Sequence, residues 1–96
     1  MYNIAFNSEK NKKLKSERGV SFEQVIEAIN DHRVLDIVEH SNKYKYENQK
    51  MYIIEMQNYV YVVPFIRNEE KQEIFLKTIF KSRKMTKQYL GGKYNG

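Results

Sequence analysis

The sequence contains no cysteine and no tryptophan, and it has one proline and four glycines among 96 residues. The absence of cysteine excludes disulfides, thiolate nucleophiles and cysteine-based zinc sites together, and it is typical of a reducing compartment. We expect no signal peptide, because charged residues rather than an apolar segment follow residues 1–6. The longest apolar run, residues 59–66, contains Pro64 and is far shorter than the ~20 residues of a membrane-spanning helix. These absences predict a cytoplasmic protein without a membrane partner.

The chain has the size of one domain. Hydrophobic residues make up 41% and charged residues 30%, a balance typical of a small core beneath a large hydrated surface. We expect residues 1–96 to form a single domain that ends in a flexible tail at residues 91–96. Aromatic residues reach 14%, and they suit either a packed core or stacking on nucleic-acid bases.

Charge is distributed unevenly along the chain. Residues 1–19 contain five basic and two acidic residues, and residues 71–96 contain seven basic residues and one acidic residue. The middle, residues 20–70, contains five basic and nine acidic residues. If the two basic ends meet in the fold, they form a cationic surface suited to a phosphate-bearing partner. A solvated surface without any partner would explain the same charges.

Local signals predict two helices in the N-terminal third. Residues 8–18 form a charged helix that ends at Gly19, a residue type common just past a helix C-terminus. Ser21 and Gln24 match a capping box, and apolar residues then follow at helical spacing. The second helix is expected to end at residues 31–33.

Shorter hydrophobic segments after the second helix predict four strands. These are residues 34–38, 51–56, 59–66 and 73–81. Pro64 indicates an edge strand or a bulge, residues 40–49 form a loop, and residues 67–72 form a charged turn. Ser82 is the expected N-cap of a short helix through Leu90. The predicted fold class is therefore α+β, with two N-terminal helices packed on a four-stranded antiparallel meander and a short C-terminal helix.

Several kinds of active site are not expected. Residues 91–96 lack the spacing and the strand-to-helix context of a phosphate-binding glycine loop. His32 and His40 have no second ligand at metal-site spacing, and no serine lies in a nucleophile elbow. We therefore expect no metal site and no cofactor.

Residues 77–89 combine five cations and two threonines over a strand end, a turn and a helix start. RNA cleavage through its own 2′-hydroxyl needs a base, stabilisation of the phosphorane charge and an acid. Arg83 and Lys84 suit charge stabilisation, and Tyr89 or a lysine suits the acid. His40 is the natural base by its pKa. Further expected contacts to RNA are Lys77, Lys81, Thr86 and Lys87. The same residues also suit phosphate binding without chemistry.

Two motifs lie near opposite ends of the chain, Arg-Gly-Val-Ser-Phe-Glu at residues 18–23 and Ser-Arg-Lys-Met-Thr-Lys-Gln-Tyr at residues 82–89. They resemble the opening HGVSFEEA and the closing SARKAT segments of BrnT-type toxins, a resemblance that spans residues 6–90. It implies a RelE-like fold, a toxin of endoribonuclease type that inhibits translation, and a DNA-binding antitoxin as partner. It implies a structural role for residues 19–22. It implies functional roles for Arg83, Lys84 and Thr86.

Three functions remain open from the sequence. The first is an RNA-cleaving toxin with a basic cleft between the sheet and residues 82–90. The second is a non-catalytic module that binds RNA or a ribosomal surface, with salt-sensitive affinity and no cleavage products. The third is a protein that has lost the activity and binds only an antitoxin-like partner, with no specific affinity for RNA.

Overall fold

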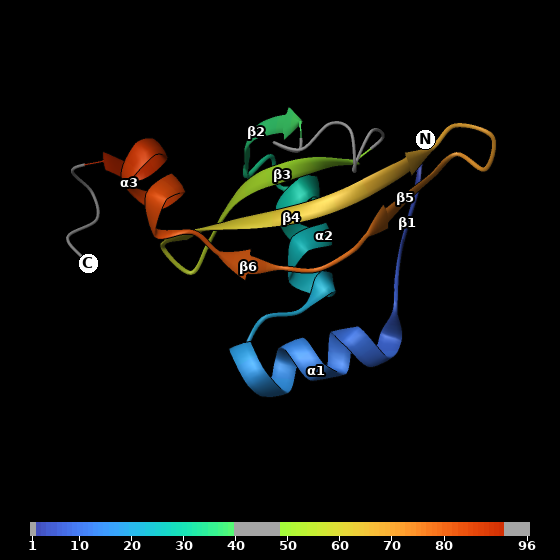
Figure 1. Cartoon of the computed structure of the whole chain (residues 1–96), viewed down its shortest axis with the longest axis horizontal. Helices are drawn as coiled ribbons and strands as arrows, with labels where there is room; N and C mark the ends of the chain where they lie inside the picture. The colour runs from blue at the N-terminus through green and yellow to red at the C-terminus, as the bar shows by residue number, and fades with distance from the viewer. Residues whose placement is uncertain (1, 40–48, 92–96) are drawn as a thin grey trace.

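The computed structural model describes residues 2–39 and 49–91, which form an α+β fold of three helices and six strands (Figure 1). The helices are α1 (Ser8–Arg18), α2 (Phe22–Asn30) and α3 (Arg83–Leu90). The strands are β1 (Asn3–Phe6), β2 (Val34–Glu39), β3 (Gln49–Met56), β4 (Tyr59–Asn68), β5 (Glu73–Leu76) and β6 (Phe80–Lys81). All three predicted helices are confirmed.

The strands form one mixed sheet in the order β1-β5-β4-β3-β2, and β6 pairs with β4. Strands β2 to β5 are consecutive antiparallel neighbours, as the predicted meander requires. The prediction of four strands, all antiparallel, is wrong, because β1 pairs with β5 in parallel and the last predicted strand divides into β5 and β6. Strand β1 gives no local hairpin signal, since its first residue, Asn3, pairs with Glu73, 70 residues later.

Pro64 accounts for the division of the last predicted strand. It lies in β4, which is an inner strand of the sheet, so the expected edge position is wrong. The Pro64 carbonyl accepts a hydrogen bond from the Lys77 N–H at 2.8 Å. In a strand the N–H and the carbonyl of one residue point to the same side, so the missing N–H of Pro64 also faces residues 73–81. There, two residues of β4 lie opposite the three residues 77–79. The extra residue lies on the β5–β6 side of this pairing and not in β4.

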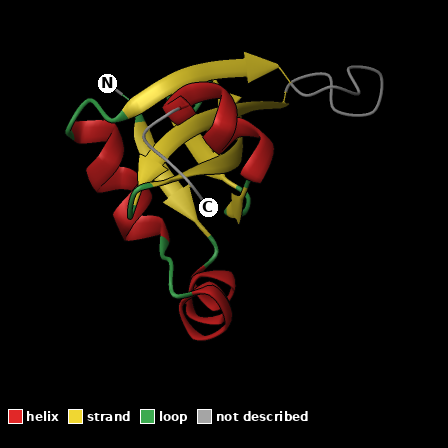
Figure 2. Ribbon diagram, turned by 90° about the vertical axis from the view of Figure 1, so that its left-hand side faces the viewer, coloured by secondary structure: helices red, strands yellow, loops and turns green. Residues whose placement is uncertain are grey.

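The sheet is covered on both faces (Figure 2). The larger core lies between the sheet and the first two helices, and α3 packs over a smaller core on the opposite face. The alternation predicted for residues 59–66 is confirmed, because Tyr61, Val63 and Phe65 belong to the larger core and Val60 and Val62 belong to the smaller one. Strand β4 is therefore buried on both faces.

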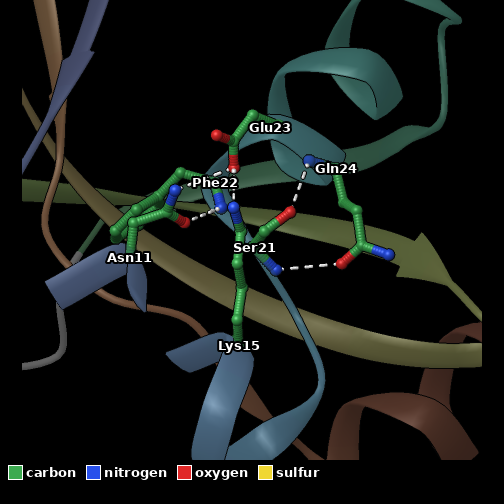
Figure 3. Close-up of polar contacts among 6 residues, drawn as sticks. All are labelled: Asn11, Lys15, Ser21, Phe22, Glu23 and Gln24. Atoms are coloured by element: carbon green, nitrogen blue, oxygen red, sulfur yellow. Dashed lines mark hydrogen bonds and ion pairs between the residues drawn. The ribbon is translucent and has the colours of Figure 1, made fainter. Parts of the chain in front are cut away.

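The junction between α1 and α2 has the predicted capping geometry (Figure 3). Gly19 ends α1 in the left-handed region with φ of 67°, where a side chain would be strained. The Ser21 side chain accepts a hydrogen bond from the Gln24 N–H at 3.2 Å, and the Ser21 N–H donates to the Gln24 side chain at 2.9 Å. These contacts support the structural role expected for residues 19–22.

Parts of two predictions lie outside the described residues. The expected loop at residues 40–49 overlaps β3 at Gln49, and its other residues, 40–48, are outside. The expected tail at residues 91–96 is outside except for Gly91. None of the described helices is long and apolar enough to cross a membrane.

Candidate nucleic-acid interface

The two basic ends of the chain meet in the fold. Helix α1, from the N-terminal region, lies beside the strand segment of residues 75–81 (Figure 1). The Arg18 guanidinium at the end of α1 donates a hydrogen bond to the Ile79 carbonyl at 2.6 Å. The two basic segments therefore come together, as a shared cationic surface requires. Five cations border the two hollows along this contact, and we call them the basic seam: Lys10, Lys13, Arg18, Lys77 and Lys81.

The first hollow lies at the N-terminal half of α1 and contains three of the seam lysines. It is a shallow, open depression of about 560 Å³. Its lining residues are Asn7, Glu9, Lys10, Lys13, Phe75 and Lys77. Three lysines against one carboxylate give this hollow a net positive charge, which favours an anionic partner.

The second hollow, which we call the Arg18 pocket, lies at the C-terminal end of α1 and is more enclosed. It has a volume of about 420 Å³. Its lining residues are Glu17, Arg18, Tyr61, Phe80 and Lys81. The Lys81 ammonium lies 5.1 Å from the centre of the Tyr59 ring, a cation–π distance that holds the lysine without neutralising its charge. Two cations and aromatic side chains thus share one concave surface.

The seam cations form no ion pairs within the described residues, although one carboxylate lines each hollow with them. Within residues 2–39 and 49–91, the ion pairs involve Lys15, Arg33 and Arg67, and none involves a residue of the basic seam. Surface cations that outnumber the nearby carboxylates repel one another, and an anion that binds between them relieves that repulsion. The arrangement is therefore suited to bind phosphate groups.

The structure divides the cations predicted to contact RNA or to act on it between the basic seam and helix α3. Lys77 and Lys81 belong to the basic seam. Arg83, Lys84 and Lys87 are exposed on α3, which packs over the opposite face of the sheet. Helix α3 is capped by Ser82, whose side chain accepts a hydrogen bond from the Met85 N–H at 3.1 Å. Arg83 and Lys84 remain accessible, but neither lines the Arg18 pocket.

Thr86 has a different position from the one its predicted RNA contact requires. Its side chain is completely buried. The Thr86 hydroxyl accepts a hydrogen bond from the Val60 N–H at 3.0 Å and donates one to the Ser82 carbonyl at 2.7 Å. Both hydroxyl interactions lie within the protein, so we assign Thr86 to the docking of α3 on β4 and not to the interface.

The Tyr89 hydroxyl also forms a hydrogen bond within the protein. It donates to Oδ2 of Asp36 at 2.8 Å, and this bond raises the pKa of Tyr89 above its ordinary value. A tyrosine with a raised pKa gives up its proton less readily, which disfavours the general-acid role. His40, the expected base, lies outside the described residues.

Sequence reasoning did not identify Arg18 or Tyr61 as candidate site residues. Arg18 was part of a motif with a structural explanation, and Tyr61 was one of several tyrosines in an alternating strand. Their proximity depends on how α1 packs beside β6, and no local pattern specifies that contact. The high basic content of residues 8–18 was the available signal.

Within the described ranges, no three His, Cys, Asp or Glu side chains come together as a metal site requires. No protein-family model matches the chain, and no curated protein sequence is significantly similar to it.

Proposed function

We propose that this protein is the toxin of a type II toxin–antitoxin system, a cytoplasmic RNA-binding protein of the BrnT-like, RelE-type class that cleaves RNA through the 2′-hydroxyl without a metal. The observation that carries the RNA-binding part is the basic seam, where cations from both ends of the chain border two adjoining hollows. RNA presents regularly spaced phosphates, and a strip of unpaired cations with nearby aromatic residues suits a single strand.

The motif resemblance supports the toxin part of the proposal. Arg83 and Lys84, which the closing motif implies are functional, are exposed and begin α3, one residue after the end of β6. An RNA strand bound in the Arg18 pocket beside Lys81 could continue toward them along the chain direction. The proposed protein partner is a DNA-binding antitoxin, which would cover part of this cationic surface.

RNA binding without cleavage is the second candidate, and one observation favours it. The described residues that line the Arg18 pocket include one carboxylate, Glu17, and no histidine, so they do not supply a pair of side chains for general acid and base. Tyr89 is bound to Asp36, and neither Arg83 nor Lys84 lines the pocket. A binding module that blocks RNA or a ribosomal surface would need the seam alone.

The binding part is tested by the affinity of the purified protein for fluorescein-labelled single-stranded RNA, measured by anisotropy over a series of salt concentrations. A seam variant changes three lysines to glutamine: Lys10→Gln, Lys13→Gln and Lys77→Gln. A control variant makes the same charge change at exposed lysines outside both hollows: Lys12→Gln, Lys50→Gln and Lys71→Gln. Losing three phosphate contacts should reduce the slope of log affinity against log salt by about 2 for a single strand.

We expect the seam variant to lose most of its affinity and the control variant to lose little. Equal losses in the two variants would show that net charge alone governs binding, and would overturn the assignment of the basic seam as the RNA-binding surface. A wild-type affinity no higher than that of an unrelated protein of similar charge would overturn RNA binding itself and leave the partner-binding alternative.

The toxin part is tested by induced expression in a bacterial host, with growth and total RNA integrity as readouts. The matched variant is Arg83→Ala with Lys84→Ala, two exposed positions whose replacement should leave the fold intact. Growth arrest with RNA fragmentation, both absent in the variant, supports a nuclease that uses these residues. Growth arrest with intact RNA supports RNA binding without cleavage. Normal growth while the protein is expressed and folded overturns the proposal that it is a toxin.

A further inference from the structure

The Arg18 pocket contains more than the charge that general RNA binding requires. Its two cations come from opposite ends of the chain, and each is positioned by a contact within the protein. Arg18 is fixed by its hydrogen bond to the Ile79 carbonyl, and Lys81 by the ring of Tyr59. Such contacts reduce the side-chain freedom that would be lost when an anion binds.

These contacts leave both cations able to bind a phosphate. A guanidinium has five N–H donors, and the bond to Ile79 uses one of them on Nη1 of Arg18. The remaining donors can contact two oxygens of one phosphate, while Lys81 adds a charged donor from β6. Arg18 and Lys81 line the same pocket, so one phosphate can lie between them.

The rest of the pocket suits a base. Its volume of about 420 Å³ lies within the range of about 300–1,000 Å³ that is typical of small-ligand sites. Phe80, which is 39% exposed, contributes aromatic surface to the wall, and the nearly buried Tyr61 lines the pocket beneath it. Glu17 adds a carboxylate with no ion-pair partner among the described residues, and an ionised carboxylate is purely an acceptor of hydrogen bonds.

We propose that the Arg18 pocket binds one guanine nucleotide of the RNA, and this inference rests on the RNA-binding function proposed above. The phosphate lies between Arg18 and Lys81, and the Glu17 carboxylate accepts hydrogen bonds from the base edge. Guanine presents two neighbouring N–H donors, on N1 and on its amino group, which match the two oxygens of a carboxylate. Adenine, by contrast, presents an acceptor at N1 next to its amino group. The pocket would thus make the protein prefer guanine at one position of its RNA.

Titration of the protein with guanosine 5′-monophosphate, adenosine 5′-monophosphate and inorganic phosphate, followed by amide chemical shifts, tests this proposal. We expect the guanine nucleotide to bind at least about tenfold more tightly than the adenine nucleotide, with shifts in residues 17–18 and 80–81, because a charge-assisted bidentate contact distinguishes them. Lys81→Gln should weaken guanine nucleotide binding by about tenfold, and Glu17→Gln should abolish the preference over adenine. Lys12→Gln, an exposed change elsewhere on α1, should alter neither.

Arg18→Gln should weaken binding further, but it also removes the bond to Ile79, so Lys81→Gln is the decisive variant for the phosphate. Equal binding of the two nucleotides would overturn the assignment of Glu17. If the nucleotides change no amide chemical shifts near Arg18, the Arg18 pocket is not the nucleotide-binding site. If this occurs while RNA affinity still depends on the seam lysines, the proposed function stands and the nucleotide inference alone fails.

Discussion

At the scale of single residues, Asn11 is a buried polar side chain whose amide has a partner on each side. Its oxygen accepts a hydrogen bond from the Phe22 N–H at 2.8 Å, and its nitrogen donates to Oε1 of Glu23 at 2.8 Å (Figure 3). The Phe22 N–H is one of the first backbone donors of α2, which no carbonyl within the helix can satisfy. Asn11 thus joins α1 to the start of α2.

Asn11→Ala should therefore destabilise the protein by about 1–3 kcal/mol, because it leaves the buried Phe22 N–H without an acceptor. Asn11→Asp should cost less at low pH than at neutral pH, since an ionised Asp retains the acceptor but repels Glu23. Urea unfolding provides the measurement, with Lys12→Ala at the exposed neighbouring position as the control. A loss in Asn11→Ala no larger than in the control would contradict this account.

Thr86 allows a second residue-scale test, because its hydroxyl and its methyl group can be removed separately. Thr86→Val should cost about 1–3 kcal/mol, since the Val60 N–H loses its acceptor. Thr86→Ser keeps the hydroxyl and should cost about 1 kcal/mol for the lost buried methyl group. Thermal or urea unfolding of both variants should give the order wild type, Ser, Val. If RNA affinity falls in the folded Val variant but not in the Ser variant, the Thr86 hydroxyl contributes to RNA binding after all.

At the scale of elements, a hydrogen bond between two side chains joins α3 to the edge strand β2. Asp36 accepts from the Tyr89 hydroxyl through Oδ2, and through Oδ1 it accepts from the Ile37 N–H at 2.8 Å. Tyr89→Phe should speed amide exchange in the last turn of α3 while lowering global stability by less than about 1 kcal/mol, because the contact is exposed. Hydrogen exchange measured by NMR tests this. Unchanged exchange together with lost RNA cleavage would indicate that the hydroxyl acts in chemistry.

Which elements could be predicted depended on the range of the interactions that specify them. The helices have local signals, such as Gly19 after α1, the pair Ser21 and Gln24, and the cap Ser82. The hairpin of β3 and β4 is local as well. Strand β1 is four residues long, and a parallel partner at the other end of the chain specifies it. The break between β5 and β6 lies opposite Pro64, which belongs to the neighbouring strand β4. The sequence of residues 73–81 alone therefore did not indicate it.

At the scale of the whole molecule, the charge pattern predicted part of the candidate site. The two basic segments meet as that pattern allowed, because α1 packs beside residues 75–81. Two predicted cations, Lys77 and Lys81, line the hollows. The identity of the pocket could not be predicted, since it depends on the tertiary position of Arg18. The burial of Thr86 could not be predicted either, because a motif match contains no information about exposure.

The acidic side chains of the middle segment should make stability of the whole molecule depend on pH in one direction. The pKa of Glu23 is lowered from its ordinary value of 4.5, chiefly by the hydrogen bond from Asn11, and that of Glu69 is lowered chiefly by the hydrogen bond from the Tyr2 hydroxyl. A lowered pKa in the folded state means that the unfolded chain binds protons first as the pH falls. The stabilisation is thus fully present above about pH 4.5 and is lost as the pH falls through the lower folded values.

Urea unfolding between pH 7 and pH 3 should accordingly show a decline that begins as the pH approaches about 4.5 and continues to the lowest pH reached. The double variant Glu23→Gln and Glu69→Gln should start from a lower stability at pH 7 and show a shallower decline, because two of the carboxylates responsible no longer titrate. A double variant with the same pH profile as the wild type would place the acid sensitivity in other groups. Both side chains are exposed, so the difference between the profiles should shrink in high salt, whereas a hydrogen-bonding contribution from Asn11 and Tyr2 should persist.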